Sequence, residues 1–342
     1  MRPLGIYTVC NDTMAQQLIA LLNSIEVNAG NDIPVYVLPY DDHITQVREV
    51  IAGRDQVTLV DEPETIAHWD AFALAAWSAH PHALATWQAK YGRAGVYRLG
   101  MHRRFAAFDG PCERFLYLDA DMLVLDTLAP IFDALDLYDF VVFDNQYKAP
   151  QHVFRLESAR LYEVFGEARV HSEVFCAGFV ASKRGVIGQE QQDQVVARLR
   201  EGEAGVLYLG APDHSLLNYM VMRLEAPTVN LYRLPPEGER IRTCATVPGL
   251  ETRGAVLFDH GRRLPFLHYI GIPAWVFNRL CQGENILFPY RDLWLHYRYL
   301  REPGAQPLLQ GRPQPYQRSP GRSSRLAQRW RQRWRKLWKG QL

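Results

Sequence analysis

The first sixty residues alternate short β-prone runs with segments whose apolar residues recur at helical spacing. Extended runs cover 5–10, 33–38 and 57–60, and helical spacing covers 13–28 and 46–52. Strands and helices that alternate in this way build a doubly wound sheet, because each helix carries the chain back across the sheet. A chain of 342 residues with 48% hydrophobic residues is long enough to bury such a sheet. The sequence therefore predicts an α/β fold with a mostly parallel central sheet and flanking helices.

The clearest buried strand is the run 115–118, which is apolar or aromatic throughout and shows no alternation. This pattern is typical of a central parallel strand that is covered on both faces. Asp119 and Asp121 follow it directly, at the edge where ligands bind in open α/β sheets. Such a pair can hold Mg²⁺ or Mn²⁺ together with phosphate oxygens. A bare Asp-x-Asp is more commonly a polar turn, and its place after the strand is what favours a metal site.

The remainder of the chain continues the mixture of helices and strands. Residues 65–108 are rich in alanine and aromatic side chains, and we expect them to be helical and to pack over the sheet. A short element is expected at 122–125. Apolar spacing predicts helices at 128–135, 189–201 and 213–223, and β-prone runs predict strands at 139–143, 175–181, 229–234, 255–258 and 266–270.

Charge is distributed unevenly along the chain. The net charge is +1, from 38 basic and 37 acidic residues. No acidic residue follows Glu302, whereas ten of the basic residues lie between Arg312 and Lys339, which leaves 28 basic against 37 acidic residues in the preceding part. The body is therefore acidic, and the C-terminal segment is a separate basic one.

The C-terminal forty residues divide into two parts. Pro, Gly, Gln and Arg dominate 303–321, which predicts a linker between a domain at 1–302 and a tail at 322–342. A cationic helix that carries indoles is typical of peripheral binding to an anionic membrane surface. A solvated tail and an RNA-binding arm are the alternatives. The apolar face of the predicted tail helix consists of Leu326, Trp330, Trp334, Leu337 and Trp338.

The cysteines and the first residues bear on the compartment. Five cysteines, an odd number, show neither paired nor metal-type spacing, which fits a reducing compartment. Residues 1–11 lack the features of a signal peptide, and no apolar run approaches the roughly 20 residues that cross a bilayer. We expect a cytoplasmic protein associated peripherally with the inner face of the membrane.

Several motifs, in the same order along the chain, resemble those of glycosyltransferase family 8, the group of glycogenin and the lipopolysaccharide galactosyltransferases. The run Leu-Tyr-Leu-Asp-Ala-Asp-Met-Leu-Val-Leu at 116–125 is similar to the metal-binding signature of that family. The resemblance covers roughly residues 5–275. The other segments that carry it are 6–12, 139–144, Phe175-Cys176-Ala177-Gly178, Asp213-His214-Ser215-Leu216-Leu217-Asn218 and His268-Tyr269-Ile270-Gly271.

The resemblance implies a GT-A fold and a metal-dependent hexosyltransferase that uses a UDP-sugar and retains the anomeric configuration. It makes Asp119, Asp121 and His268 the ligands of Mn²⁺ or Mg²⁺, and a neutral imidazole suits such a set. Taken alone, a His on an apolar strand is more commonly structural. Asp144, Asp213 and His214 are the expected catalytic residues, and a helix N-cap is the alternative role for Asp213. The expected donor-binding residues are Thr8, Asn11, Asp12, Arg103, Asp119, Ala120, Asp121, Ala177, Gly178 and Gly271.

The sequence departs from the family pattern at three places. Cys176 replaces an Asn, His214 replaces a Gln, and the late motif lacks the Lys that contacts the diphosphate in relatives. Arg263 and Arg279 are candidates to replace that Lys. Arg98 and Arg104 are alternatives to Arg103.

Partners follow from this interpretation: a nucleotide-sugar donor, a cell-surface glycan or lipid-linked acceptor, and an anionic membrane surface, with no nucleic acid expected. The acceptor site is predicted in 147–170 and 240–253, where the sequence is least similar to the family. A non-catalytic nucleotide-sugar-binding protein and an RNA-binding protein acting through its tail are the alternatives. A nucleotidyltransferase is disfavoured because the segment after the first strand, 10–13, lacks a Gly-rich loop with a basic residue.

Overall fold

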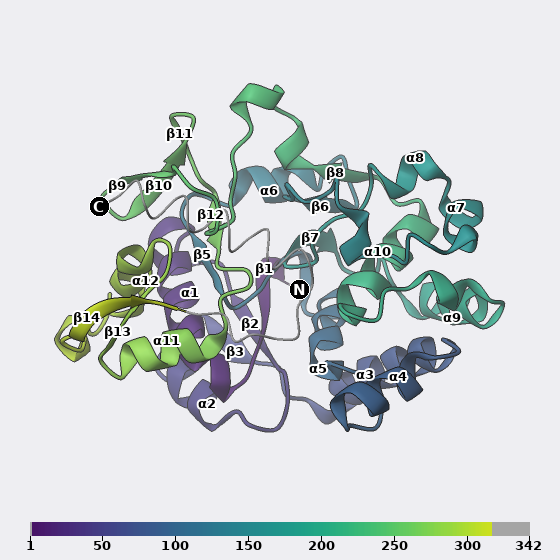
Figure 1. The fold of residues 1–342 in the computed structure, drawn as a ribbon, viewed down its shortest axis with the longest axis horizontal. Coiled ribbons are helices and arrows are strands. Elements are labelled where there is room, and N and C mark those ends of the chain that lie inside the picture. The colour runs from purple at the N-terminus through teal and green to yellow at the C-terminus, as the bar shows by residue number, and fades with distance from the viewer. Residues whose placement is uncertain (1, 317–342) are drawn as a thin grey trace.

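The computed structural model describes residues 2–316, with the side chain of Arg2 excepted. Over these residues the chain forms a seven-stranded central sheet between two layers of helices (Figure 1). In spatial order the strands are β3 (Val57–Leu59), β2 (Val35–Pro39), β1 (Arg2–Cys10), β4 (Cys112–Leu118), β7 (Phe179–Lys183), β6 (Phe140–Val142) and β8 (Thr228–Asn230). The predicted α/β class with a mostly parallel sheet is confirmed.

One strand of the central sheet runs against its neighbours. β1 to β4 are parallel where they pair, and β6 is parallel to β8. β7 lies between β4 and β6 and is antiparallel to both. The carboxyl ends of β4 and β6 therefore meet the start of β7 at one edge, where Leu118 is opposite Phe179 and Val142 is opposite Val180.

The two faces of the sheet are buried by different sets of helices. On β1, Ile6 packs in a core with α1 (Ala15–Asn28), α2 (Thr45–Ile51) and α6 (Ala129–Ala134). Its neighbour Tyr7 points to the other core, because side chains alternate along a strand. That core contains α3 (Pro63–Ser78), α4 (Ala83–Tyr91), α7 (Ala159–Phe165), α9 (Gln189–Arg200) and α10 (Pro212–Leu224); the short helices α5 (Leu99–His102) and α8 (Glu167–Val170) lie on the same side (Figure 1).

A third core forms beside the central sheet. β5 (Met122–Val124) pairs antiparallel with β12 (Phe266–His268), with His268 opposite Met122. Leu123 and Leu267 from this pair pack against α11 (Ala274–Cys281) and α12 (Arg291–Arg298). The neighbouring small sheets are β9 (Glu251–Arg253), β10 (Val256–Asp259) and β11 (Arg262–Arg263), and β13 (Glu284–Leu287) with β14 (Gln310–Pro315).

Two predicted strands are shorter than expected, because side chains take over their backbone groups. The strand predicted at 175–181 begins only at Phe179, since Asn218 accepts a hydrogen bond from the Phe175 amide and donates one to its carbonyl. The strand predicted at 229–234 ends at Asn230, whose side chain accepts a hydrogen bond from the Tyr232 amide and starts a 3₁₀ turn.

The segment predicted as a linker is attached to the domain over the part that the structure describes. β14 pairs in parallel with β13, and Leu309 and Tyr316 pack against the third core. The sequence predicts a linker without a core, and over 310–315 the structure shows an exposed strand that is held by backbone pairing. The predicted tail helix lies outside the described residues. Between residues 2 and 316, no helix has both the length and the apolar character needed to cross a bilayer.

Candidate metal site

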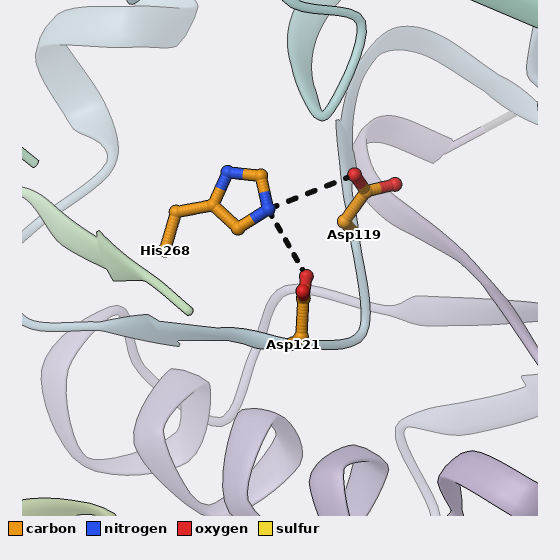
Figure 2. Close-up of side chains that lie close together, drawn as sticks. All are labelled: Asp119, Asp121 and His268. Carbon is orange, nitrogen blue, oxygen red and sulfur yellow. Dashed lines mark ion pairs between the residues drawn. The ribbon is translucent and has the colours of Figure 1, made fainter. Parts of the chain in front are cut away.

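Three predicted metal ligands meet at the carboxyl edge of the central sheet. Asp119 follows β4, Asp121 precedes β5, and His268 is the last residue of β12. His268 Nε2 lies 3.1 Å from Asp121 Oδ1 and 3.8 Å from Asp119 Oδ2 (Figure 2). One ligand atom from each residue lies within 4.8 Å of the others. Two carboxylates and an imidazole form a donor set that suits Mn²⁺ or Mg²⁺.

The pairing of β5 with β12 is what brings His268 to the carboxylates. The Tyr269 amide donates a hydrogen bond of 3.0 Å to the carbonyl of Asp121, which continues the ladder past the end of β12. On the other side, the Asp119 amide donates to the carbonyl of Gly178, at 2.9 Å. The backbone therefore fixes both acidic residues before any ion binds.

The charges at this site depend on one another. Burial alone would raise the pKa of Asp119, but Arg104, His268 and His214 outweigh it and hold that pKa below its ordinary value. Burial alone would lower the pKa of His268, but Asp121 and Asp119 raise it. The two carboxylates thus favour the protonated form of the imidazole.

Gly178 makes room for the candidate metal ligands. A Cβ atom at this position would lie 2.6 Å from Asp119 Oδ2 and 3.0 Å from His268 Cε1. Of the predicted donor-binding residues, Ala177 precedes Gly178 and Ala120 lies between Asp119 and Asp121; both are buried, and Gly271 has a φ of +80° in the turn after β12. The structure therefore brings 119–121, 177–178 and 268–269 together.

Arg104 is the basic residue beside the carboxylates. Its Nη2 lies 2.9 Å from Asp213 Oδ2 and 3.4 Å from Asp119 Oδ1, and its Nη1 donates to the carbonyl of Ala177. The guanidinium also stacks 4.4 Å from the ring of Tyr117, whose hydroxyl donates to Asp119. Tyr117 was not predicted; its signal was its place two residues before Asp119, on the same face of the strand.

Arg103, the predicted donor contact, points elsewhere. Its guanidinium pairs with both carboxylate oxygens of Asp70 and donates to the carbonyl of Pro39 at 2.8 Å. Of the three arginines named from sequence, Arg104 contacts the carboxylate cluster and Arg103 is held by Asp70, and which of them contacts a donor stays a prediction. One residue of shift along a 3₁₀ helix turns a side chain by about a third of a turn, which spacing alone does not resolve.

Asp213 and His214 lie at the start of α10, where Arg104 links Asp213 to Asp119. Asp213 is fully buried, and burial would raise its pKa, but Arg104 and then His214 lower it. Its carboxylate forms an ion pair and no capping hydrogen bond, so the alternative role as a helix N-cap is wrong. His214 Nε2 lies 3.8 Å from Asp213, and burial lowers the pKa of His214 to about 4, so the imidazole is neutral at neutral pH.

Asp144 lies just past the end of β6, in a small cavity. Its two carboxylate oxygens accept hydrogen bonds from the amides of Gln146 and Cys176, and burial raises its pKa. The cavity is lined by Asp144, His268, Phe143 and Thr243 among others and has a volume of about 20 Å³. That volume holds little more than one water molecule, so a larger ligand binds there only if the lining side chains move.

The predicted nucleotide contacts of the first strand have structural partners. Thr8 is completely buried within β1. Asn11 donates a hydrogen bond to Asp41 at 2.9 Å and accepts one from the Thr13 amide. Both carboxylate oxygens of Asp12 accept amide hydrogen bonds at the start of α2, each 3.0 Å long. The Asp12 carboxylate therefore caps α2, a role that the sequence did not predict, and its contact with a nucleotide stays a prediction.

The two candidates to replace the absent Lys are also engaged. Arg279 pairs with Glu284 and lies over the ring of Trp275. Arg263 donates to the carbonyl of Leu125 and to Asn28, at 2.6 and 2.8 Å. Neither guanidinium contacts the metal-binding side chains.

Comparisons with known proteins support the fold. No protein-family model matches the sequence, and no curated protein matches it. The apo structure of the bifunctional glycosyltransferase WbbM aligns with 90% of this chain and 52% of its own, with 11% identity and a TM-score of 0.52. The galactosyltransferase LgtC, in complex with donor and acceptor sugar analogues, aligns over 63% and 70% of the two chains, with 19% identity and a TM-score of 0.43. Mouse xyloside xylosyltransferase 1 aligns over 67% and 84%, with 12% identity and a TM-score of 0.45.

The likeness to WbbM, at a TM-score of 0.52, concerns the fold alone. The chain spans about half the length of WbbM, and every identity is below one fifth. The chain therefore has the mixed α/β fold of GT-A glycosyltransferases, with a central, mostly parallel sheet. The resemblance to glycosyltransferase family 8 stays a prediction from sequence motifs.

Proposed function

We propose that this protein is a metal-dependent glycosyltransferase that moves a hexose from a UDP-sugar to a cell-surface glycan or lipid-linked acceptor on the cytoplasmic side of the membrane. The observation that carries the proposal is the convergence of Asp119, Asp121 and His268 at the carboxyl edge of the sheet, next to Asp144. Open α/β sheets bind their ligands at this edge.

Asp119, Asp121 and His268 would hold Mn²⁺ or Mg²⁺, which when bound stabilises the negative charge on the departing nucleoside diphosphate. Arg104 keeps Asp119 ionised, because it lies against that carboxylate in a buried setting. The Tyr117 hydroxyl orients the same carboxylate by donating to Oδ1. The chain therefore supplies an ionised, fixed ligand without first having to reorganise it.

Asp144, Asp213 and His214 are the proposed residues around the transferred sugar. The Asp144 carboxylate faces the cavity that His268 also lines, which suits hydrogen bonds to sugar hydroxyls. His214 is neutral, so its imidazole can accept or donate a hydrogen bond. By resemblance the reaction retains configuration, with the departing phosphate helping to deprotonate the acceptor hydroxyl. Asp213 then acts through Arg104 and His214, because it is itself fully buried.

The donor site is tested by isothermal titration of UDP, with and without Mn²⁺, into the wild type and Asp121→Asn. We expect Mn²⁺-dependent binding that weakens by at least about tenfold in the variant, since even outer-sphere partners of metal ligands are worth about 10- to 100-fold. Asp136→Asn is a matched control, because Asp136 is an exposed carboxylate paired with Arg114. UDP binding that is independent of both Mn²⁺ and Asp121 would contradict the proposal.

We also propose that the basic tail holds the enzyme on the inner face of the membrane. The support is the spacing of Trp330, Trp334 and Trp338 among arginines. Full-length protein should sediment with phosphatidylglycerol vesicles and not with phosphatidylcholine vesicles, and Trp→Ala at all three positions should abolish this. RNA binding that survives the triple change, without vesicle binding in the wild type, would favour the alternative.

A further inference from the structure

Two loops beside the Asp144 cavity carry aromatic side chains whose rings contact one another. Residues 145–148 follow β6, and residues 231–244 follow β8 and run to the cavity, which Thr243 lines. The rings of Tyr147 and Tyr232 lie 6.3 Å apart. Tyr232 in turn meets the edge of Phe143 at 6.2 Å, and Phe143 lines the cavity. Tyr147 is buried and Tyr232 is partly exposed, so Tyr232 is the tyrosine of this cluster that a ligand can reach.

Four cations surround these rings, and we call them the cationic rim. The guanidinium of Arg233 lies 4.8 Å from the ring of Tyr147 and that of Arg240 5.8 Å from the ring of Tyr232. The ammonium of Lys148 lies 5.7 Å from Tyr147. Arg242 is the fourth cation of the rim. Burial raises the pKa of Tyr232, and it outweighs the lowering effect of Arg240, Lys148 and Arg242 on that pKa.

Only half of the rim is neutralised by carboxylates within residues 2–316. Arg242 forms a two-pronged pair with Asp259, at 2.8 and 2.6 Å, and Lys148 lies 3.6 Å from Glu237. Arg233 and Arg240 have carbonyl partners instead: Arg233 Nη1 donates to Ser172, and Arg240 Nε to Pro235. Over the described residues no carboxylate lies within 4 Å of either guanidinium.

This uncompensated charge stands out against the rest of the chain. Before Arg312 the sequence has 28 basic and 37 acidic residues, so an excess of positive charge is contrary to the overall balance. Arginine offers parallel donors that match phosphate oxygens, and tyrosine rings stack against sugar faces. The two together, next to a predicted sugar cavity, suit a ligand that joins a sugar to a phosphate.

We propose that the acceptor is a phosphorylated glycan, whose phosphate is bound by Arg233 and Arg240 while its sugar packs against Tyr232, the ring that the buried Tyr147 supports. This rests on the proposed transferase function and names the chemical class of its acceptor. The phosphate can be a monoester on the glycan or part of a phosphodiester or diphosphate that links it to lipid; the shared requirement is a phosphate beside the acceptor sugar.

The test uses full-length protein and ³¹P NMR titration with glucose 1-phosphate and glucose 6-phosphate, with glucose followed by saturation-transfer NMR. We expect a hexose phosphate to bind the wild type, and the double variant Arg233→Gln/Arg240→Gln to bind it at least about tenfold more weakly, since both charge-assisted contacts are lost. The matched control is Arg198→Gln/Arg200→Gln, which removes two exposed charges from α9 and should leave binding unchanged.

The remaining arms separate this proposal from its rivals. Inorganic phosphate that binds as tightly as the hexose phosphates would overturn it, since the rim would then be a simple anion site. Loss of Mn²⁺-dependent UDP binding in the double variant would also overturn it, because the rim would hold the donor diphosphate. Loss of binding to sugar-free phosphatidylglycerol vesicles in the double variant would overturn it as well, because the rim would then bind lipid headgroups.

Failure of the donor proposal gives a different result. Asp121→Asn should lose UDP binding and still bind the hexose phosphate, because Asp121 is a metal ligand and not part of the rim. If the wild type binds hexose phosphate through Arg233 and Arg240 but binds no UDP, the acceptor class stands and the transferase function falls. If it binds UDP with Mn²⁺ but no hexose phosphate, the acceptor class falls alone.

Discussion

The carboxylate of Asp213 lies 2.9 Å from the guanidinium of Arg104, and neither side chain has appreciable contact with water. Replacing Arg104 by Gln leaves a fully buried carboxylate without its cation. Breaking a buried pair in this way costs about 3–5 kcal/mol. We expect the free energy of unfolding of Arg104→Gln, measured by urea denaturation, to fall by that amount.

Two further variants identify the cause. Arg103→Gln breaks the Asp70 pair, which is only partly buried, and should cost about 1 kcal/mol. Arg104→Gln/Asp213→Asn removes both charges and should recover part of the loss seen in Arg104→Gln. Equal losses of unfolding free energy in Arg104→Gln and Arg103→Gln would contradict the prediction, because the deeper burial of the Arg104 pair would then have no effect on stability.

Gly178 is predicted to control metal affinity through space alone. In Gly178→Ala the added methyl group would press on Asp119 and His268, at 2.6 and 3.0 Å. Mn²⁺ affinity, measured by electron paramagnetic resonance titration, should fall at least about tenfold, as it does when ligand orientation is disturbed elsewhere. In Gly205→Ala the new Cβ atom meets nothing within 4 Å, so this variant should bind Mn²⁺ as the wild type does.

Asp12→Ala tests the capping role found for that residue. Loss of both hydrogen bonds at the start of α2 should reduce the free energy of unfolding by about 0.5–2 kcal/mol. The dissociation constant of UDP in the presence of Mn²⁺ should stay within about twofold. A large loss of UDP binding with unchanged stability would favour the nucleotide-binding role predicted from sequence.

Glu203 should make stability depend on pH in the acid range. Burial alone would raise its pKa, but Arg223 and Tyr219, which both donate hydrogen bonds to it, lower it. The unfolded chain therefore binds the proton more readily, so this stabilisation is present above the ordinary carboxyl pKa and is lost as pH falls through the folded value.

The corresponding variant is Glu203→Gln. At neutral pH its free energy of unfolding should be about 1.5–3 kcal/mol lower, and the difference from the wild type should shrink between about pH 5 and pH 3. Glu163→Gln, which breaks the exposed pair with Arg160, should change stability by less than about 1 kcal/mol at any pH. A constant difference for Glu203→Gln down to pH 3 would rule out the ion pair as its source.

Local patterns in the sequence predicted much of the fold and of the metal cluster. The strand ending at Leu118 and the two carboxylates after it could be identified because burial and turn chemistry act over a few residues. His268 could be added only through motif resemblance, because its approach depends on the pairing of β12 with β5.

The contacts that the sequence did not predict share a physical origin, since each joins residues that are distant in sequence. Asp12 resembles a ligand contact but caps a helix that begins about thirty residues later. Arg103 and Arg104 are neighbours in one 3₁₀ turn, but their side chains point to different carboxylates, Asp70 and Asp213. The strand at 310–315 buries almost nothing of its own and is specified by the free edge of β13. No periodicity of the segment itself could predict that pairing.

The antiparallel contact between β5 and β12 also sets an order of events. Asp119 and Asp121 are synthesised well before His268. His268 reaches them only after β12 has paired with β5. A ligand that binds the native state alone stabilises that state. Bound metal would therefore stabilise only a chain that has been synthesised past β12 and has packed this strand against β5. Loss of metal would be an early sign that β12 has separated from β5.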